Sequence, residues 1–72
     1  MNKRQAYKIM FKAYPDVLDI VKMCEMLNIG VKMAYRLLKE NKIAHLKVGR
    51  LYRIPKVRVI DYLLLQDDSI KK

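Results

Sequence analysis

The chain has 72 residues, of which 53% are apolar and 32% are charged. This length suits one compact domain and excludes an integrase-type catalytic domain, and the composition is that of an ordered protein rather than a disordered tail. The formal net charge of +9 predicts attraction to a polyanion. Nucleic acid is the first candidate and an anionic membrane surface the second.

The cysteine content and the absence of long apolar runs bear on the cellular compartment. Cys24 is the only cysteine, so an intrachain disulfide is excluded and a reducing cytoplasm fits. No apolar run approaches the roughly 20 residues that span a bilayer. The first 14 residues also lack the continuous apolar stretch of a signal peptide. We therefore expect a cytoplasmic protein without a membrane partner.

The first predicted element is an amphipathic helix over residues 3–14, which we assign to an N-terminal segment 1–14. Its apolar side chains recur at the helical spacing i, i+3, i+4 and i+7, at Tyr7, Met10, Phe11 and Tyr14. Pro15 ends the helix because it disfavours helical backbone at the preceding residue. Packing against the rest of the domain is the favoured interpretation, and a membrane-surface helix is the alternative because the other face is basic.

Two further helices joined by a tight turn are predicted next. After an extended piece at Val17–Leu18, Asp19 is placed to cap a helix that ends near Leu27. The segment Asn28-Ile29-Gly30 has the residues of a turn. A second helix then runs over residues 31–40, with a buried stripe at Ala34, Leu37 and Leu38 and with Asn41 placed to close it. This is the helix-turn-helix pattern.

A β-hairpin and a last helix complete the predicted domain. From Ile43 the pattern alternates, with apolar Ala44, Leu46 and Val48 between His45 and Lys47. A turn at Gly49-Arg50 leads to a second strand over residues 51–54. Pro55 suits the first turn of a helix whose apolar positions are Val59, Ile60, Leu63 and Leu64. We expect the domain to cover residues 15–66 and a flexible tail residues 67–72.

The basic residues gather on the second helix and the hairpin. Between residues 32 and 58 the only acid is Glu40, whereas the bases are Lys32, Arg36, Lys39, Lys42, Lys47, Arg50, Arg53, Lys56 and Arg58. An α-helix fits the major groove of B-DNA, and an adjacent hairpin can follow the backbone or enter the minor groove. The distribution of charge therefore favours DNA over a merely solvated helix face.

The predicted DNA contacts lie on two elements. The recognition helix is expected to present Val31, Lys32, Met33, Tyr35, Arg36 and Lys39. Among these, Arg36 suits a guanine edge or a phosphate, Tyr35 a phosphate or sugar, and Met33 a thymine methyl. The hairpin is expected to contribute Lys47, Gly49, Arg50, Tyr52 and Arg53.

No catalytic constellation or metal-ligand spacing occurs. His45 is the only histidine, is expected to be exposed on a strand face, and has no partner set for a metal. Cys24 lies on an apolar helix stripe, which is typical of a small core residue. We expect neither enzymatic activity nor a cofactor.

The same residues resemble a known family. The stretches LNIGVKMAYRLLKENKI (27–43) and HLKVGRLYRIPKVRVIDYL (45–63) are similar to the excisionase-type helix-turn-helix domain, which is related to the DNA-binding head of MerR-type regulators. The resemblance covers residues 15–65. It implies a winged helix-turn-helix, mainly α with a small β-hairpin. Residues 31–40 would form the recognition helix and residues 47–53 the wing, and an N-terminal helix would precede both.

The resemblance also implies a role. Excisionases are small architectural factors of phages and integrative elements that bind side by side, bend DNA and bias an integrase towards excision. We therefore expect sequence-specific binding to double-stranded DNA, cooperative self-association on it, and a tyrosine-type integrase as partner. Asn28 and Asn41 stand where the family often has Gly, and Met33 where it often has Thr or Ser. The alternatives are a small transcriptional regulator and a basic interaction module that does not bind DNA.

Overall fold

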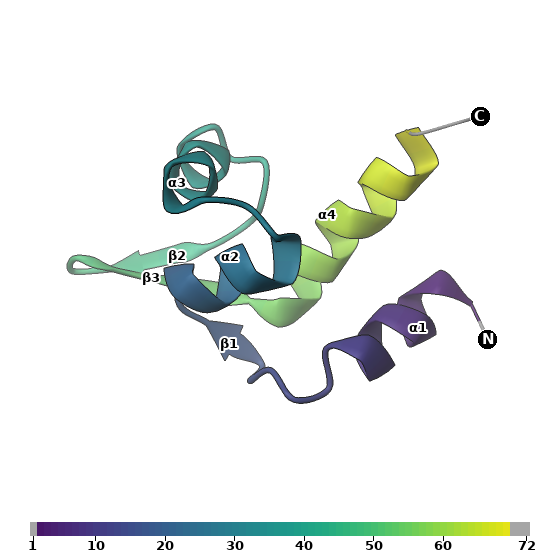
Figure 1. The fold of residues 1–72 in the computed structure, drawn as a ribbon. Helices are drawn as coiled ribbons and strands as arrows, with labels where there is room; N and C mark the ends of the chain where they lie inside the picture. The colour runs from purple at the N-terminus through teal and green to yellow at the C-terminus, as the bar shows by residue number, and fades with distance from the viewer. Residues whose placement is uncertain (1, 70–72) are drawn as a thin grey trace.

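The computed structural model describes residues 2–69 of the chain. In chain order these residues form α1 (Lys3–Met10), β1 (Val17–Leu18), α2 (Ile20–Leu27), α3 (Val31–Lys39), β2 (Leu46–Val48), β3 (Leu51–Pro55) and α4 (Lys56–Ser69). The predicted fold class is confirmed. A helix-turn-helix is followed by a hairpin wing and a closing helix, and α1 lies at the other end of the molecule from α3 and the wing (Figure 1).

Helix α1 begins as the sequence predicts but ends earlier. The Asn2 side chain accepts a hydrogen bond from the Gln5 backbone N–H (2.8 Å), and the Gln5 side chain accepts one from the Asn2 N–H (3.2 Å), which is a capping box. The helix stops at Met10 instead of residue 14 because the chain turns at Phe11. The Lys56 ammonium donates to the carbonyl oxygens of Phe11 and Tyr14, in the turns that follow the helix.

The aromatic residues of this segment pack on the domain, so the favoured interpretation of the N-terminal helix holds for most of its apolar stripe. Tyr7 and Phe11 stack at 6.1 Å between ring centroids, and the Tyr14 ring meets Phe11 edge-on at 5.8 Å. Phe11 is buried. Met10 is 63% exposed, however, so its place in the predicted stripe is wrong.

An ion-pair network also joins α1 to α4. The Asp61 carboxylate accepts from Arg4 Nη1 at 2.8 Å and from Arg58 Nη1 at 3.2 Å. The hydrogen bond from Arg4 is the main cause that holds the pKa of Asp61 below its usual range; partial burial acts in the opposite direction.

The turn of the helix-turn-helix depends on Asn28. Asp19 caps α2 as predicted, since its side chain accepts from the Lys22 N–H at 2.8 Å. Asn28 ends α2 in the left-handed conformation (φ 55°), and Asn41 after α3 does the same (φ 58°). Gly30, in contrast, has an extended φ of −77° and serves as the N-cap of α3. The left-handed position of this turn is therefore filled by asparagine, which tolerates it.

The sheet has three strands in the order β1-β3-β2, all antiparallel. Val17–Leu18 forms strand β1, with Leu18 opposite Ile54, a pairing that adds a strand to the predicted hairpin. Leu18 and Ile54 face the core. Leu46 and Val48, the apolar positions of the first hairpin strand, are 64% and 56% exposed, because the helices cover the opposite side of the sheet.

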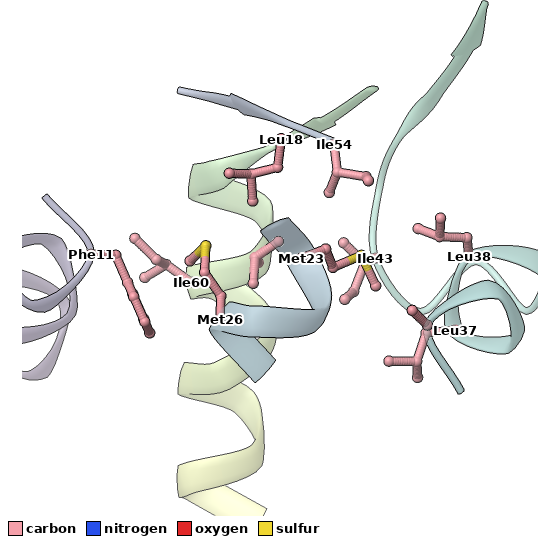
Figure 2. Close-up of a cluster of buried hydrophobic side chains, with 11 residues drawn as sticks. Phe11, Leu18, Met23, Met26, Leu37, Leu38, Ile43, Ile54 and Ile60 are labelled. Atoms are coloured by element: carbon pink, nitrogen blue, oxygen red, sulfur yellow. The ribbon is translucent and has the colours of Figure 1, made fainter. Parts of the chain in front are cut away.

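The core fills the space between α2, the sheet, α3 and α4. Figure 2 shows Met23 and Met26 of α2 at its centre, with Leu18 and Ile54 of the sheet above them and Leu37 and Leu38 of α3 to one side. The buried set is Phe11, Leu18, Met23, Met26, Ala34, Leu37, Leu38, Ile43, Ile54, Val59 and Ile60. Only one face of α3 therefore packs in the core, and its other face is exposed to solvent.

Helix α4 begins directly after Pro55, which is the last residue of β3 rather than part of the helix. It continues to Ser69, whereas the sequence predicted a tail from residue 67. Residues 70–72 of that predicted tail lie outside the described residues.

Candidate nucleic-acid interface

The outward face of α3 contains every side chain predicted for the recognition helix. Ala34, Leu37 and Leu38 anchor the helix in the core. The remaining positions are exposed, namely Val31, Lys32, Met33, Tyr35, Arg36 and Lys39. The structure therefore brings three cations and three less polar side chains onto one solvent-facing surface.

The first turns of α3 form a shallow hollow. It is lined by Gly30, Lys32, Met33 and Arg36. The Arg36 side chain is 68% exposed, and its Nε lies 3.7 Å from Glu40 Oε2 one turn later. Exposed ion pairs of this kind contribute little to stability. The guanidinium can therefore leave Glu40 and bind a guanine edge or a phosphate.

The wing presents its bases at the tip and on its outer face. Gly49 adopts φ 62° in the two-residue turn, a conformation that suits glycine, and Arg50 follows it. Arg53 is exposed on the outer face, opposite Leu46 in the register. Val48 and Leu51, which pair beside the tip, are each 56% exposed. The predicted wing residues thus divide between the tip, the outer face and the side that faces α3.

An aromatic cluster on that last side joins the wing to the recognition helix. The Tyr52 ring centroid lies 5.6 Å from that of Tyr35 on α3 and 5.5 Å from that of His45. Lys47 Nζ lies 5.3 Å from the centre of the same ring, within cation–π range. Tyr52 therefore brings the wing into contact with α3.

Sequence reasoning named Tyr35 and Tyr52 but missed their contact. His45 is half-buried rather than exposed, and its Nδ1 lies 2.9 Å from the Ile43 carbonyl oxygen. The placement of His45, Lys47 and Tyr52 at alternating strand positions was the available signal. Nothing in the pattern showed that Tyr35 would lie across from them.

Two of the basic residues counted with this surface serve α4 instead. The Lys56 side chain is only 16% exposed and binds the carbonyl oxygens of Phe11 and Tyr14. Arg58 pairs with Asp61. The basic surface is therefore confined to α3, the loop that follows it and the wing.

Cys24 on α2 is a half-buried free cysteine. Burial raises the pKa of the Cys24 thiol, which makes it less nucleophilic than an exposed cysteine. Among the side chains that the structure describes, no three of His, Cys, Asp or Glu gather in a way that could hold a metal ion.

Comparison with known proteins agrees with this geometry. Over the described part of the chain, no helix has the length and apolar character needed to cross a membrane. No curated protein matches the chain significantly, and neither does any solved structure. Residues 17–64, from β1 to within α4, match the family described as helix-turn-helix domain, a type of DNA-binding domain. Because this match covers most of the chain, the protein belongs to the helix-turn-helix domain family.

Proposed function

We propose that the protein is an excisionase-like architectural factor, related to MerR-type DNA-binding heads, that binds specific sites on double-stranded DNA. The observation behind this proposal is the joining of α3 and the wing through Tyr35 and Tyr52. Two basic elements held at a fixed separation suit simultaneous contact with two neighbouring parts of a duplex. The recognition helix would lie in the major groove, and the wing beside it.

Each element has a separate part in this proposal. Lys32 and Arg36, in the first turns of α3, are placed where a recognition helix usually meets base edges. Lys39, Lys47 and Arg53 would bind phosphates and supply affinity that does not depend on sequence. At the wing tip, Arg50 next to the exposed Val48 and Leu51 is a combination that suits the minor groove.

Cooperative assembly follows from the small size of this surface. One recognition helix and one wing contact few base pairs, so useful specificity requires neighbouring copies or a partner protein. We propose that copies bind side by side on repeated sites, bend the DNA and act with a tyrosine-type integrase of the same mobile element.

The test begins with selection of bound sequences from a random duplex pool, followed by footprint titration on a duplex with two adjacent selected sites. The proposal predicts that both sites fill together and that the complex migrates as bent DNA in a circular-permutation assay. Independent filling without bending would contradict the architectural role. That outcome would leave the same surface to a small transcriptional regulator, for which repression from a single site in a reporter is the expected activity.

A further inference from the structure

A second charged surface lies where α1 meets the start of α4, away from α3 and the wing (Figure 1). It is a groove of about 470 Å³. Its lining consists of three lysines, two aliphatic residues and one acid, namely Lys8, Lys12, Lys56, Val57, Ile60 and Asp16. None of these residues belongs to the DNA surface described above.

The three lysines of this groove lie on its two walls. Lys56 is held in place by hydrogen bonds of 2.8 Å to the Tyr14 carbonyl and 3.3 Å to the Phe11 carbonyl, which leaves its charge fixed in the wall. Lys8 and Lys12 lie four residues apart on the opposite wall. No carboxylate of the described residues lies within ion-pair distance of either of them. Asp16 is fully exposed and stands 3.9 Å from Lys56.

The floor of the groove is apolar. Val57 is 44% exposed although it lies between charged neighbours, and Ile60 closes the bottom. A concave apolar floor between lysines matches a peptide that has an aliphatic or aromatic side chain flanked by carboxylates. A DNA backbone has no such apolar group, and a flat lipid surface does not enter a groove.

We propose that this groove binds an acidic peptide segment of a protein partner. Because it lies at the other end of the molecule from α3, the peptide and DNA would be held at the same time. The site would therefore recruit a partner protein to the DNA that the domain has bound. This inference stands apart from the excisionase role, since any DNA-bound helix-turn-helix protein could use such a site.

The probe for the test is a fluorescent synthetic peptide of alternating Asp and Leu residues, and its binding to the 72-residue chain is followed by anisotropy. We expect the double variant Lys8→Glu with Lys12→Glu to weaken its binding about tenfold. The matched control, Lys3→Glu with Lys22→Glu, changes the net charge equally outside the groove and should retain near-native affinity. Val57→Ser should weaken the binding of the Asp–Leu peptide but leave the binding of poly-L-glutamate unchanged.

Changes in the amide chemical shifts of the wild-type chain on addition of the peptide give the location of binding independently. Changes concentrated at Lys8, Lys12 and Val57 would support the groove. Changes spread over α3 and the wing, or an equal loss of peptide affinity in the two double variants, would overturn the proposal in favour of unspecific charge attraction. The proposal would also be overturned if the Lys8→Glu, Lys12→Glu variant, but not the control variant, lost binding to anionic vesicles or to a DNA duplex. Duplex affinity of the two double variants is measured in parallel, so failure of the groove is distinguishable from failure of the DNA surface.

Discussion

At the scale of single residues, Arg36 is the side chain best placed to select a base. It is exposed beside the hollow at the start of α3, and its only ionic partner among the described residues is Glu40 at 3.7 Å. A bidentate contact to guanine contributes about 1–3 kcal/mol of discrimination. We therefore expect Arg36→Ala to weaken binding by about that amount and to relax the preference at one base pair.

Competition binding against a set of single-base variants of the selected site measures this effect. Lys3→Ala is the control, because Lys3 is an exposed cation at the far end of the molecule, on α1. An equal loss of affinity of Arg36→Ala for all sequences would assign Arg36 to the phosphate backbone instead.

Asp61 gives a prediction for pH. Its pKa is lowered in the folded state, chiefly by the hydrogen bond from Arg4. The carboxylate therefore stabilises the fold above the usual pKa of an unfolded aspartate, and this contribution is lost as pH falls through the lower folded value. We expect Asp61→Asn to lower the free energy of unfolding at neutral pH and the difference to disappear in strong acid.

Urea unfolding as a function of pH tests this linkage. Asp16→Asn is the control, since Asp16 is fully exposed and its ion pair with Lys56 is long, at 3.9 Å. A deficit of Asp61→Asn that stayed constant into strong acid would show that the charge of Asp61 is not the cause.

At the scale of elements, the turn between α2 and α3 depends on the backbone conformation of Asn28. Residues with a Cβ other than Asn and Asp adopt φ 55° at a cost of about 1–2 kcal/mol. Asn28→Ala should therefore destabilise the protein by about 1 kcal/mol, while Asn28→Gly should be close to neutral. Denaturant midpoints of the two variants measure this. Equal losses would mean that the Asn28 side chain, rather than its backbone conformation, stabilises the turn.

The Tyr52 cluster makes a second prediction at this scale. The ring contacts Tyr35, His45 and Lys47, so removing it should release the wing from α3. Tyr52→Ala should cost about 2 kcal/mol of stability and weaken DNA binding, whereas Tyr52→Phe should keep both near native because the ring is retained. Unfolding curves and duplex affinity are measured together. Native DNA affinity in a folded Tyr52→Ala protein would show that the wing needs no such anchor.

At the scale of the whole molecule, the helix-turn-helix was predictable because its signals are local. Ala34, Leu37 and Leu38 recur with helical spacing, and Asp19 and Asn41 mark helix ends in the sequence itself. The contact of Lys56 with the segment that follows α1 was not predictable, because Lys56 is distant from that segment in sequence. The pairing of Leu18 with Ile54 is also long-range.

The candidate site shows the same limit. Alternation in the hairpin separated Leu46 and Val48 from Lys47, but which face is buried depends on where the helices pack. The exposed stripe of α3 followed from its periodicity, whereas the contact between Tyr35 and Tyr52 required the three-dimensional arrangement. The use of Lys56 likewise depended on partners distant in the sequence, the carbonyl oxygens of Phe11 and Tyr14.

The most direct test of the central claim, that α3 and the wing form the DNA-binding surface, is the salt dependence of duplex binding. We expect log K to fall with log salt by about 0.9 per phosphate contacted. The double variant Arg36→Ala with Arg50→Ala should bind more weakly and with a shallower slope, and Lys3→Ala with Lys22→Ala should match the wild type. The absence of duplex binding at low salt, or equal losses in both double variants, would contradict the claim.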